Sequence, residues 1–195
     1  MRASEAASVP AAAAERWDTA HVVAAPVLVG SPGAGKSSVL EALATLHDIE
    51  DVAHGAIEAE QLSLGRPLLP ASSWVPQLAA VLSLQREAGR RRFLISATVV
   101  TATDLAGVRS ATAADALLVV CLSASPATVA ARIDAREPDH WPGKLPLIAR
   151  ARELASSTPR LPGIDLIIDT EQRAARDVAA EVFAAMRSRG MLGSR

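Results

Sequence analysis

The feature that most constrains this chain is a glycine-rich segment that begins at residue 30. It follows the apolar run Val27-Leu28-Val29, and Gly30 to Ser37 fit the pattern G-x-x-x-x-G-K-[ST]. Glycines let the backbone turn tightly and bring its N–H groups close to a phosphate chain. The start of the following helix adds unpaired N–H groups and the positive end of the helix dipole. The pattern therefore predicts a phosphate-binding loop between a buried strand over 25–29 and a helix over 35–47.

Each part of this loop has an expected role in binding a nucleotide. Lys36 supplies a mobile cation for the outer phosphates, and the Ser37 hydroxyl can ligate Mg²⁺. A strand-to-helix turn that contains glycines by chance is the alternative, but the complete pattern in its strand–loop–helix context argues against it. The predicted nucleotide-binding residues in this segment are Gly30, Ser31, Pro32, Gly33, Ala34, Gly35, Lys36, Ser37 and Ser38.

The composition excludes several other classes of protein. Twenty basic and 21 acidic residues leave a net charge of −1, which argues against a basic surface for nucleic acid. A single cysteine, Cys121, excludes an intrachain disulfide and fits a reducing compartment. No apolar run reaches the ~18–20 residues needed to span a bilayer. We therefore expect a cytoplasmic protein, monomeric or homodimeric, with no nucleic-acid or membrane partner.

Strand and helix patterns alternate along the chain, whose 195 residues suit one domain. This order predicts an α/β fold, a single P-loop NTPase domain with a five-stranded parallel sheet, helices on both faces and a short lid. We expect the domain to span 21–190, between a flexible leader over 1–20 and a tail over 191–195. The predicted strands are 25–29, 93–97, 116–122 and 164–168, with a short second strand or an extended turn near 49–52. The later helices are 73–88, one ending near 113, 125–136, 147–156 and 171–188.

Three features, spread over roughly residues 25–188, resemble the small-molecule kinases of the nucleoside-monophosphate-kinase-like group. The group includes shikimate kinase, gluconate kinase and chloramphenicol phosphotransferase. The first feature is the phosphate loop, and the second is Asp51 followed by Ile57-Glu58, near the place where shikimate kinases carry an Asp-x-Asp motif and then Ile-Glu. The third is the apolar segment 119–122, which leads into a helix that bears Arg132 and Arg136. The resemblance implies ATP-dependent, Mg²⁺-requiring phosphorylation of a small molecule.

The resemblance also implies roles for residues beyond the loop. Arg132 would lie against the adenine or ribose, and Arg136 would lie near the phosphates. Residues 137–146 would form the lid, with Lys144 as a further cation. The run from 164 to Thr170 resembles the last strand and adenine-side loop of chloramphenicol phosphotransferase-like proteins, which puts Thr170 on the nucleotide side.

The acceptor half of the site depends on acidic residues after the second predicted strand. If that strand ends beside the phosphate loop, Asp51 can take the proton of an acceptor hydroxyl or hold Mg²⁺-bound water. His54 is the alternative base, and Glu58 is either exposed on a helix or a ligand of the acceptor. The predicted catalytic residues are Lys36, Asp51 and Arg136, and the predicted metal ligands are Ser37 and Asp51.

The expected reaction is transfer of phosphate from ATP to a hydroxyl group of a small molecule. No charged side chain lies between Arg66 and Arg86, which favours a mostly neutral acceptor such as a sugar, a nucleoside or an antibiotic-like alcohol. The alternative is a nucleotide-binding regulatory or interaction protein with weak ATPase activity, because Asp51 is the only acidic candidate near a strand end. A GTPase is disfavoured, because Asp104–Gly107 fits D-x-x-G far from the expected strand end and no N-K-x-D sequence occurs.

Overall fold

The computed structural model describes residues 22–65 and 73–192, and the predicted leader over 1–20 lies outside them. Five parallel strands form one sheet in the order β2-β3-β1-β4-β5. The strands are β1 (Ala24–Val29), β2 (Gly55–Glu58), β3 (Phe93–Ala97), β4 (Ala116–Ser123) and β5 (Leu166–Asp169). The helices are α2 (Lys36–Ile49), α3 (Trp74–Glu87), α4 (Ala102–Thr112), α5 (Pro126–Arg136), α6 (Lys144–Ser157) and α7 (Ala175–Ser188). The prediction of a single α/β domain with a five-stranded parallel sheet is confirmed.

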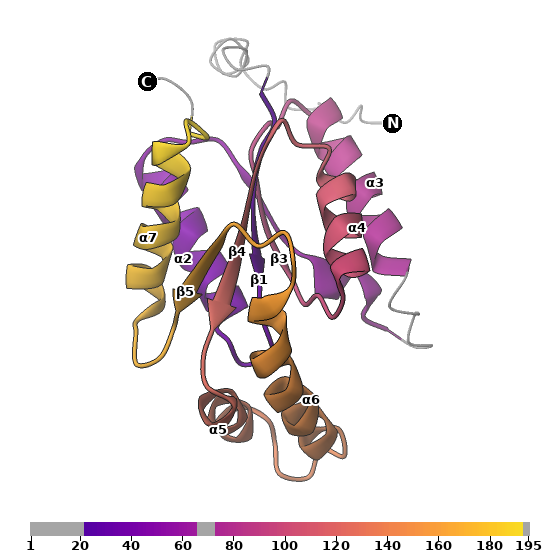
Figure 1. The fold of residues 1–195 in the computed structure, drawn as a ribbon. Coiled ribbons are helices and arrows are strands. Elements are labelled where there is room, and N and C mark those ends of the chain that lie inside the picture. Colours follow the sequence, from indigo (N-terminus) through magenta and orange to yellow (C-terminus); the bar gives the residue numbers. More distant parts are fainter. Residues whose placement is uncertain (1–21, 66–72, 193–195) are drawn as a thin grey trace, which may run out of the picture.

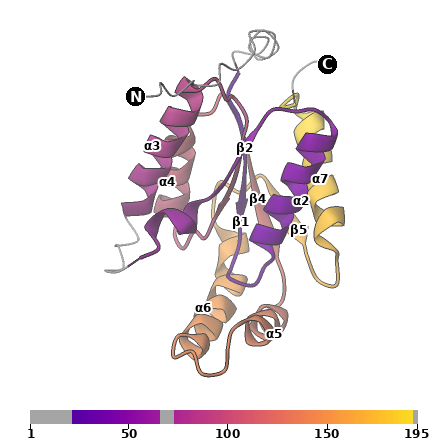
Figure 2. The ribbon, with the colours of Figure 1, turned by 180° about the vertical axis from the view of Figure 1, so that it is seen from behind.

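Helices cover both faces of the sheet. Helices α3 and α4 lie on one face and α2 and α7 on the other, as Figures 1 and 2 show from opposite sides. Successive side chains of a strand point to opposite faces. Accordingly Val27 and Val29 of β1 join the core beneath α3 and α4, whereas Leu28 joins the core beneath α2 and α7. Burial on both sides explains why β1 and β4 are apolar, except for Ser123 at the end of β4.

The hairpin of α5 and α6 projects beyond the carboxyl ends of the strands (Figure 1). Helix α5 begins where the sequence predicts, because the Ser125 hydroxyl accepts a hydrogen bond from the Thr128 amide (3.1 Å) and Pro126 follows the cap. Its buried face shares a small core with α6. Helix α6 begins at Lys144, so only 137–143 of the predicted lid segment 137–146 lies outside a helix. That residues 137–146 act as a lid stays a prediction.

The second strand does not lie where the sequence pattern puts it. Helix α2 continues to Ile49, whose side chain is 73% exposed, and the strand β2 begins only at Gly55. The amide of Val52 donates to the carbonyl of His47 (2.8 Å), which closes the end of α2. Ile57, not Ile49, supplies the buried strand residue (6% exposed). The strand predicted near 49–52 is therefore wrong, whereas the alternative of an extended turn agrees with the turn at Asp51. The two apolar residues Ile49 and Val52 are too few to distinguish a helix end from a short strand.

The C-terminal boundary also differs from the predicted one. Met191, which the sequence analysis assigns to the tail, is 2% exposed and packs in the core beneath α2 and α7. Its carbonyl accepts a hydrogen bond from Arg92 Nε (3.2 Å). The packed part of the chain thus extends at least to Met191, and residues 193–195 lie outside the described residues.

Candidate nucleotide-binding site

The glycine-rich loop is pressed against its neighbours at the carboxyl edge of the sheet. Gly33 has φ 79° and Gly35 has φ 95°, both in the left-handed region. A Cβ atom at Gly33 would lie 2.7 Å from the carbonyl oxygen of Val129 in α5. A Cβ atom at Gly30 would lie 2.5 Å from the carbonyl oxygen of Leu122 in β4. The loop therefore needs glycine both for its turn and for its close approach to β4 and α5.

Lys36 opens α2 directly after this loop, and its side chain is 9% exposed. Its Nζ donates hydrogen bonds to the carbonyl oxygens of Gly30 (3.1 Å) and Ser31 (3.3 Å). Burial lowers the pKa of the Lys36 ammonium, and the carboxylates of Glu60 and Glu58 oppose that shift. The loop thus holds a cation inside the turn, at the N-terminus of a long helix where anions bind.

The carboxylate beside Lys36 belongs to Glu60, which the sequence analysis does not single out. Glu60 lies in the 3₁₀ helix η2 (Ala59–Ser63), directly after β2, and its Oε1 is 3.7 Å from Lys36 Nζ. The hydroxyl of Thr98, the first residue after β3, donates a hydrogen bond to the same oxygen. Glu58 is half-buried at the last position of β2, not on a helix. The pair Glu58-x-Glu60 after the buried Ile57 is the sequence signal that would have found this carboxylate.

Asp51 does not reach this site. It lies in the turn after α2, whereas Lys36 begins that helix, and fourteen helical residues span about 20 Å. His54 lies at the same remote end: its Nδ1 hydrogen-bonds the Val52 carbonyl (3.0 Å), and its ring centroid is 5.1 Å from that of His47. The assumption that Asp51 follows a strand ending beside the loop is wrong, so neither Asp51 nor His54 can reach an acceptor or a metal held there.

On the other side of the loop, the structure brings Arg132 and Thr170 together. Arg132 donates to the carbonyl oxygens of Gly33 (3.2 Å) and Thr170 (2.7 Å) and to the Thr170 hydroxyl (3.2 Å). The Thr170 hydroxyl donates in turn to the Ala34 carbonyl (3.1 Å). These contacts border a cavity of about 260 Å³ whose lining also includes Ser38 and Arg173. A cavity next to the phosphate loop is where the rest of a bound nucleotide could lie.

The two remaining predicted cations, Arg136 and Lys144, differ in how firmly carboxylates bind them. Arg136 is 60% exposed and pairs with Glu137 (2.7 Å), yet it lies near enough to Lys36 to contribute to lowering the pKa of that ammonium. Lys144 is buried at the start of α6, where Asp134 (2.8 Å) and Asp139 (2.6 Å) bind it and raise its pKa. Lys144 therefore stabilises the hairpin and is not free to bind phosphate. Arg136 makes only an exposed ion pair, which it can exchange for a contact with phosphate.

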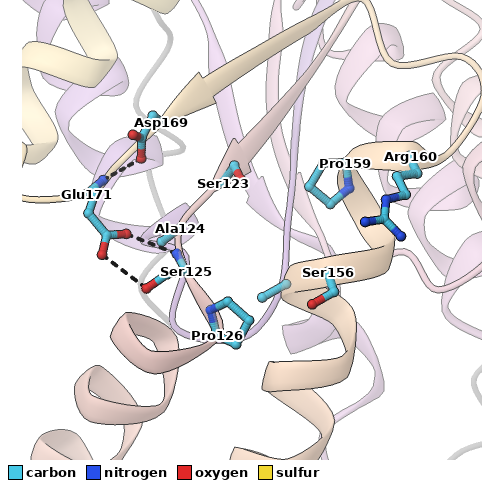
Figure 3. A pocket seen from close by; sticks show the side chains of 10 residues that line it. Ser123, Ala124, Ser125, Pro126, Ser156, Pro159, Arg160, Asp169 and Glu171 are labelled. Carbon is cyan, nitrogen blue, oxygen red and sulfur yellow. Dashed lines mark hydrogen bonds between the residues drawn. The ribbon is translucent and has the colours of Figure 1, made fainter.

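A second cavity, of about 560 Å³, lies between the start of α5, the end of α6 and the end of β5 (Figure 3). The carboxylate of Glu171 accepts hydrogen bonds from the Ser125 amide (2.9 Å) and hydroxyl (3.1 Å). A further bond, from the Thr128 hydroxyl, contributes most to lowering the pKa of Glu171. A protein carboxylate thus already occupies the N-terminus of α5, whereas the N-terminus of α2 remains available to a phosphate.

Comparison with known proteins agrees with this geometry. Residues 26–159 match the model of the AAA domain family, so the chain belongs to this family of P-loop domains. A search of curated proteins found no match. None of the helices within residues 22–65 and 73–192 combines the length with the apolar character that a bilayer-spanning helix requires.

Solved structures of small-molecule kinases share the fold. A sugar kinase from Janibacter is 16% identical with a TM-score of 0.64, covering 89% of this chain and 99% of its own. A gluconokinase from Sinorhizobium meliloti is 22% identical with a TM-score of 0.58, covering 87% and 99%. Shikimate kinase from Acinetobacter baumannii, solved with shikimate, is 18% identical with a TM-score of 0.59, covering 86% and 94%. The resemblance to small-molecule P-loop kinases is thus confirmed for the fold.

Proposed function

We propose that this protein is an ATP-dependent kinase that phosphorylates a hydroxyl group of a small molecule. The observation that carries the proposal is the approach of Glu60 Oε1 to Lys36 Nζ (3.7 Å) at the mouth of the phosphate loop. Phosphoryl transfer requires cations around the transferred group and a group that orients the acceptor and takes its proton. Lys36 can supply the cation and Glu60 the proton-accepting group, and the two side chains lie next to each other.

The residues of the loop fit Mg-ATP as the donor. The left-handed turns at Gly33 and Gly35 and the start of α2 give a concave set of amides suited to phosphates. The exposed Ser37 hydroxyl, in the first turn of α2, and the carboxylate of Glu58 are the oxygen groups we propose as direct or water-mediated Mg²⁺ ligands. Bound Mg²⁺ would neutralise charge on the phosphates. We propose the cavity between Arg132 and Thr170 for the nucleoside.

We propose for Glu60 the role of base that the sequence predicts for Asp51. Glu60 follows β2 directly, and together with Glu58, the last residue of that strand, it forms an acidic pair beside the phosphate loop. We therefore propose Glu60 as the base for the acceptor hydroxyl, Lys36 as the cation for the transferred phosphate and Arg136 as a second cation that approaches it.

The acceptor we propose is a sugar, a nucleoside or an antibiotic-like alcohol without a large negative charge. The two carboxylates at the end of β2 would repel an anion, and Lys36 is already committed to the loop carbonyls and the phosphate. We further propose a cytoplasmic enzyme, monomeric or homodimeric, with no nucleic-acid or membrane partner. The net charge of −1 argues against a basic surface for nucleic acid, and the single cysteine, Cys121, fits a reducing compartment.

Incubation of the protein with Mg-ATP and a panel of hydroxyl compounds tests this function. The panel contains neutral sugars, polyols, nucleosides, alcohol antibiotics and, as anionic comparators, gluconate and shikimate. We expect ADP release that a panel compound stimulates, together with a product heavier by one phosphate. Glu60→Gln should lower this turnover by roughly 10²–10⁴-fold and keep the affinity for a non-hydrolysable ATP analogue.

Two outcomes would count against the proposal. ADP release that no compound stimulates would favour the regulatory protein with weak ATPase activity. Full transfer activity in Glu60→Gln would keep the kinase but remove Glu60 from its mechanism. Glu41→Gln is a matched control, because this exposed glutamate of α2 makes the same chemical change outside the site.

A further inference from the structure

Thr98 occupies a place that strand register sets beside Glu60. In the pairing of β2 with β3, Glu58 lies opposite Ser96. Glu60 lies two residues after Glu58, and Thr98 lies two residues after Ser96. Both therefore follow directly from matched positions on neighbouring parallel strands. The Thr98 hydroxyl donates a hydrogen bond to Glu60 Oε1, and among the described residues this is the only hydrogen bond that its side chain makes.

The two oxygens of the Glu60 carboxylate are not equivalent. Oε1 accepts the Thr98 hydrogen bond and faces Lys36 Nζ at 3.7 Å. Within the described residues, Oε2 accepts no hydrogen bond. The carboxylate is 42% exposed, so without the contact at Oε1 it could turn freely toward water.

We propose that Thr98 is a positioning residue that fixes the Glu60 carboxylate through Oε1 and so presents Oε2 to the acceptor hydroxyl. This inference rests on the proposed kinase function. Oε2 takes the hydroxyl proton as the acceptor oxygen bonds to the terminal phosphorus of ATP. The bond from that phosphorus to the bridging oxygen breaks, and ADP leaves with the electron pair. Glu60 then carries the proton, which passes to water when the product leaves.

A purely structural role for Thr98 would have different consequences. Lys36 is already held by the carbonyls of Gly30 and Ser31, so it does not depend on Thr98 for its place. Loss of the Thr98 hydroxyl should therefore leave nucleotide binding unchanged and affect only the step that uses Glu60. Valine has nearly the shape of threonine without the hydroxyl, and serine keeps the hydroxyl without the methyl group.

The experiment compares Thr98→Val, Thr98→Ser, Glu60→Gln and the double variant Thr98→Val/Glu60→Gln. The acceptor is the panel compound that the wild-type protein phosphorylates fastest. For Thr98→Val we expect kcat to fall by about ten- to a hundredfold, because a misplaced group costs that much. The KM for ATP and the affinity for the non-hydrolysable analogue should stay unchanged. Thr98→Ser should recover most of kcat, and Thr98→Val should cost nothing further in the Glu60→Gln background.

Each failure has its own meaning. Wild-type kcat in Thr98→Val, with Glu60→Gln inactive, would overturn the positioning role and leave the kinase proposal standing. So would equal losses in the Ser and Val variants, or losses that multiply in the double variant. A wild-type protein that phosphorylates no panel compound would overturn the proposed function, and this inference would fall with it. Thermal unfolding and analogue binding of each variant establish that it is folded.

Discussion

Replacement of Gly33 by alanine tests whether close packing against α5, and not backbone freedom alone, demands glycine in the phosphate loop. The matched control is Gly35→Ala in the same loop. Both positions have a positive φ, 79° at Gly33 and 95° at Gly35. A Cβ atom at Gly33 would meet the Val129 carbonyl oxygen at 2.7 Å, whereas a Cβ atom at Gly35 meets nothing within 4 Å. The two substitutions therefore share the dihedral strain and differ in the collision.

The magnitudes follow from these two terms. A left-handed alanine costs about 1–2 kcal/mol, and the lower entropy of the unfolded chain returns about 0.4–1 kcal/mol. Gly35→Ala should therefore lower the free energy of unfolding by about 1 kcal/mol. Gly33→Ala adds an overpacking cost of about 1–3 kcal/mol, because the backbone of α5 is not free to yield as a long side chain is. We expect a total loss of about 2–4 kcal/mol.

Urea denaturation of both variants without nucleotide measures the difference between their free energies of unfolding. The midpoint shifts with that free energy when the slope is unchanged. Affinity for the ATP analogue gives a second readout. Arg132 lies one turn beyond Val129 in α5, so a displaced α5 should also weaken its contacts with Thr170. Equal destabilisation by the two substitutions, or a larger effect at Gly35, would refute the packing argument.

Three further predictions concern charged and titratable side chains. Lys36→Met should weaken analogue binding by roughly ten- to a hundredfold in calorimetry, because a charged hydrogen-bond donor to the phosphates is lost; an unchanged affinity would contradict the loop assignment. Arg132→Lys should also weaken binding, by about tenfold, since an ammonium cannot hold Gly33 and Thr170 through one planar fork; equal affinity would show that this fork is dispensable. Burial lowers the pKa of His47 to about 4, so the unfolded chain takes up this proton first as the pH falls. Stability should therefore drop between about pH 6.5 and pH 4, by up to about 3 kcal/mol, and His47→Gln should flatten that dependence in urea denaturation; an equal slope in the variant would refute it.

The elements that the sequence predicts well are those with strong local patterns. Strand β3 runs from Phe93 to Ala97 as predicted, and α5 begins behind its Ser125 cap. Buried parallel strands are continuous apolar runs, and a serine followed by proline marks a helix start whatever the rest of the chain does. Strand β2 is short, lies at the sheet edge and contains Gly55 and an exposed Ala56, so no comparable pattern distinguishes it.

The choice of Asp51 as the catalytic carboxylate depends on the strand predicted over 49–52. With a strand over 49–52, Asp51 would have reached the carboxyl edge of the sheet. With α2 extended to Ile49, the same residue lies at the opposite end. An error of a few residues in the position of the predicted strand therefore displaces the predicted carboxylate by the length of α2, because α2 and β2 run in opposite directions between the two edges of the sheet.

By itself, the sequence determined the loop from Gly30 to Ser38, because the conformations and groups that bind phosphate there come from consecutive residues. It also determined the α/β class, through the alternation of strand and helix patterns. The tertiary structure alone decided which carboxylate meets Lys36. The parallel register of β2 and β3 brings Glu60 and Thr98 to the start of α2, and this pairing joins segments far apart in the chain, so the acidic pair Glu58-x-Glu60 alone does not show that Glu60 meets Lys36 and Thr98.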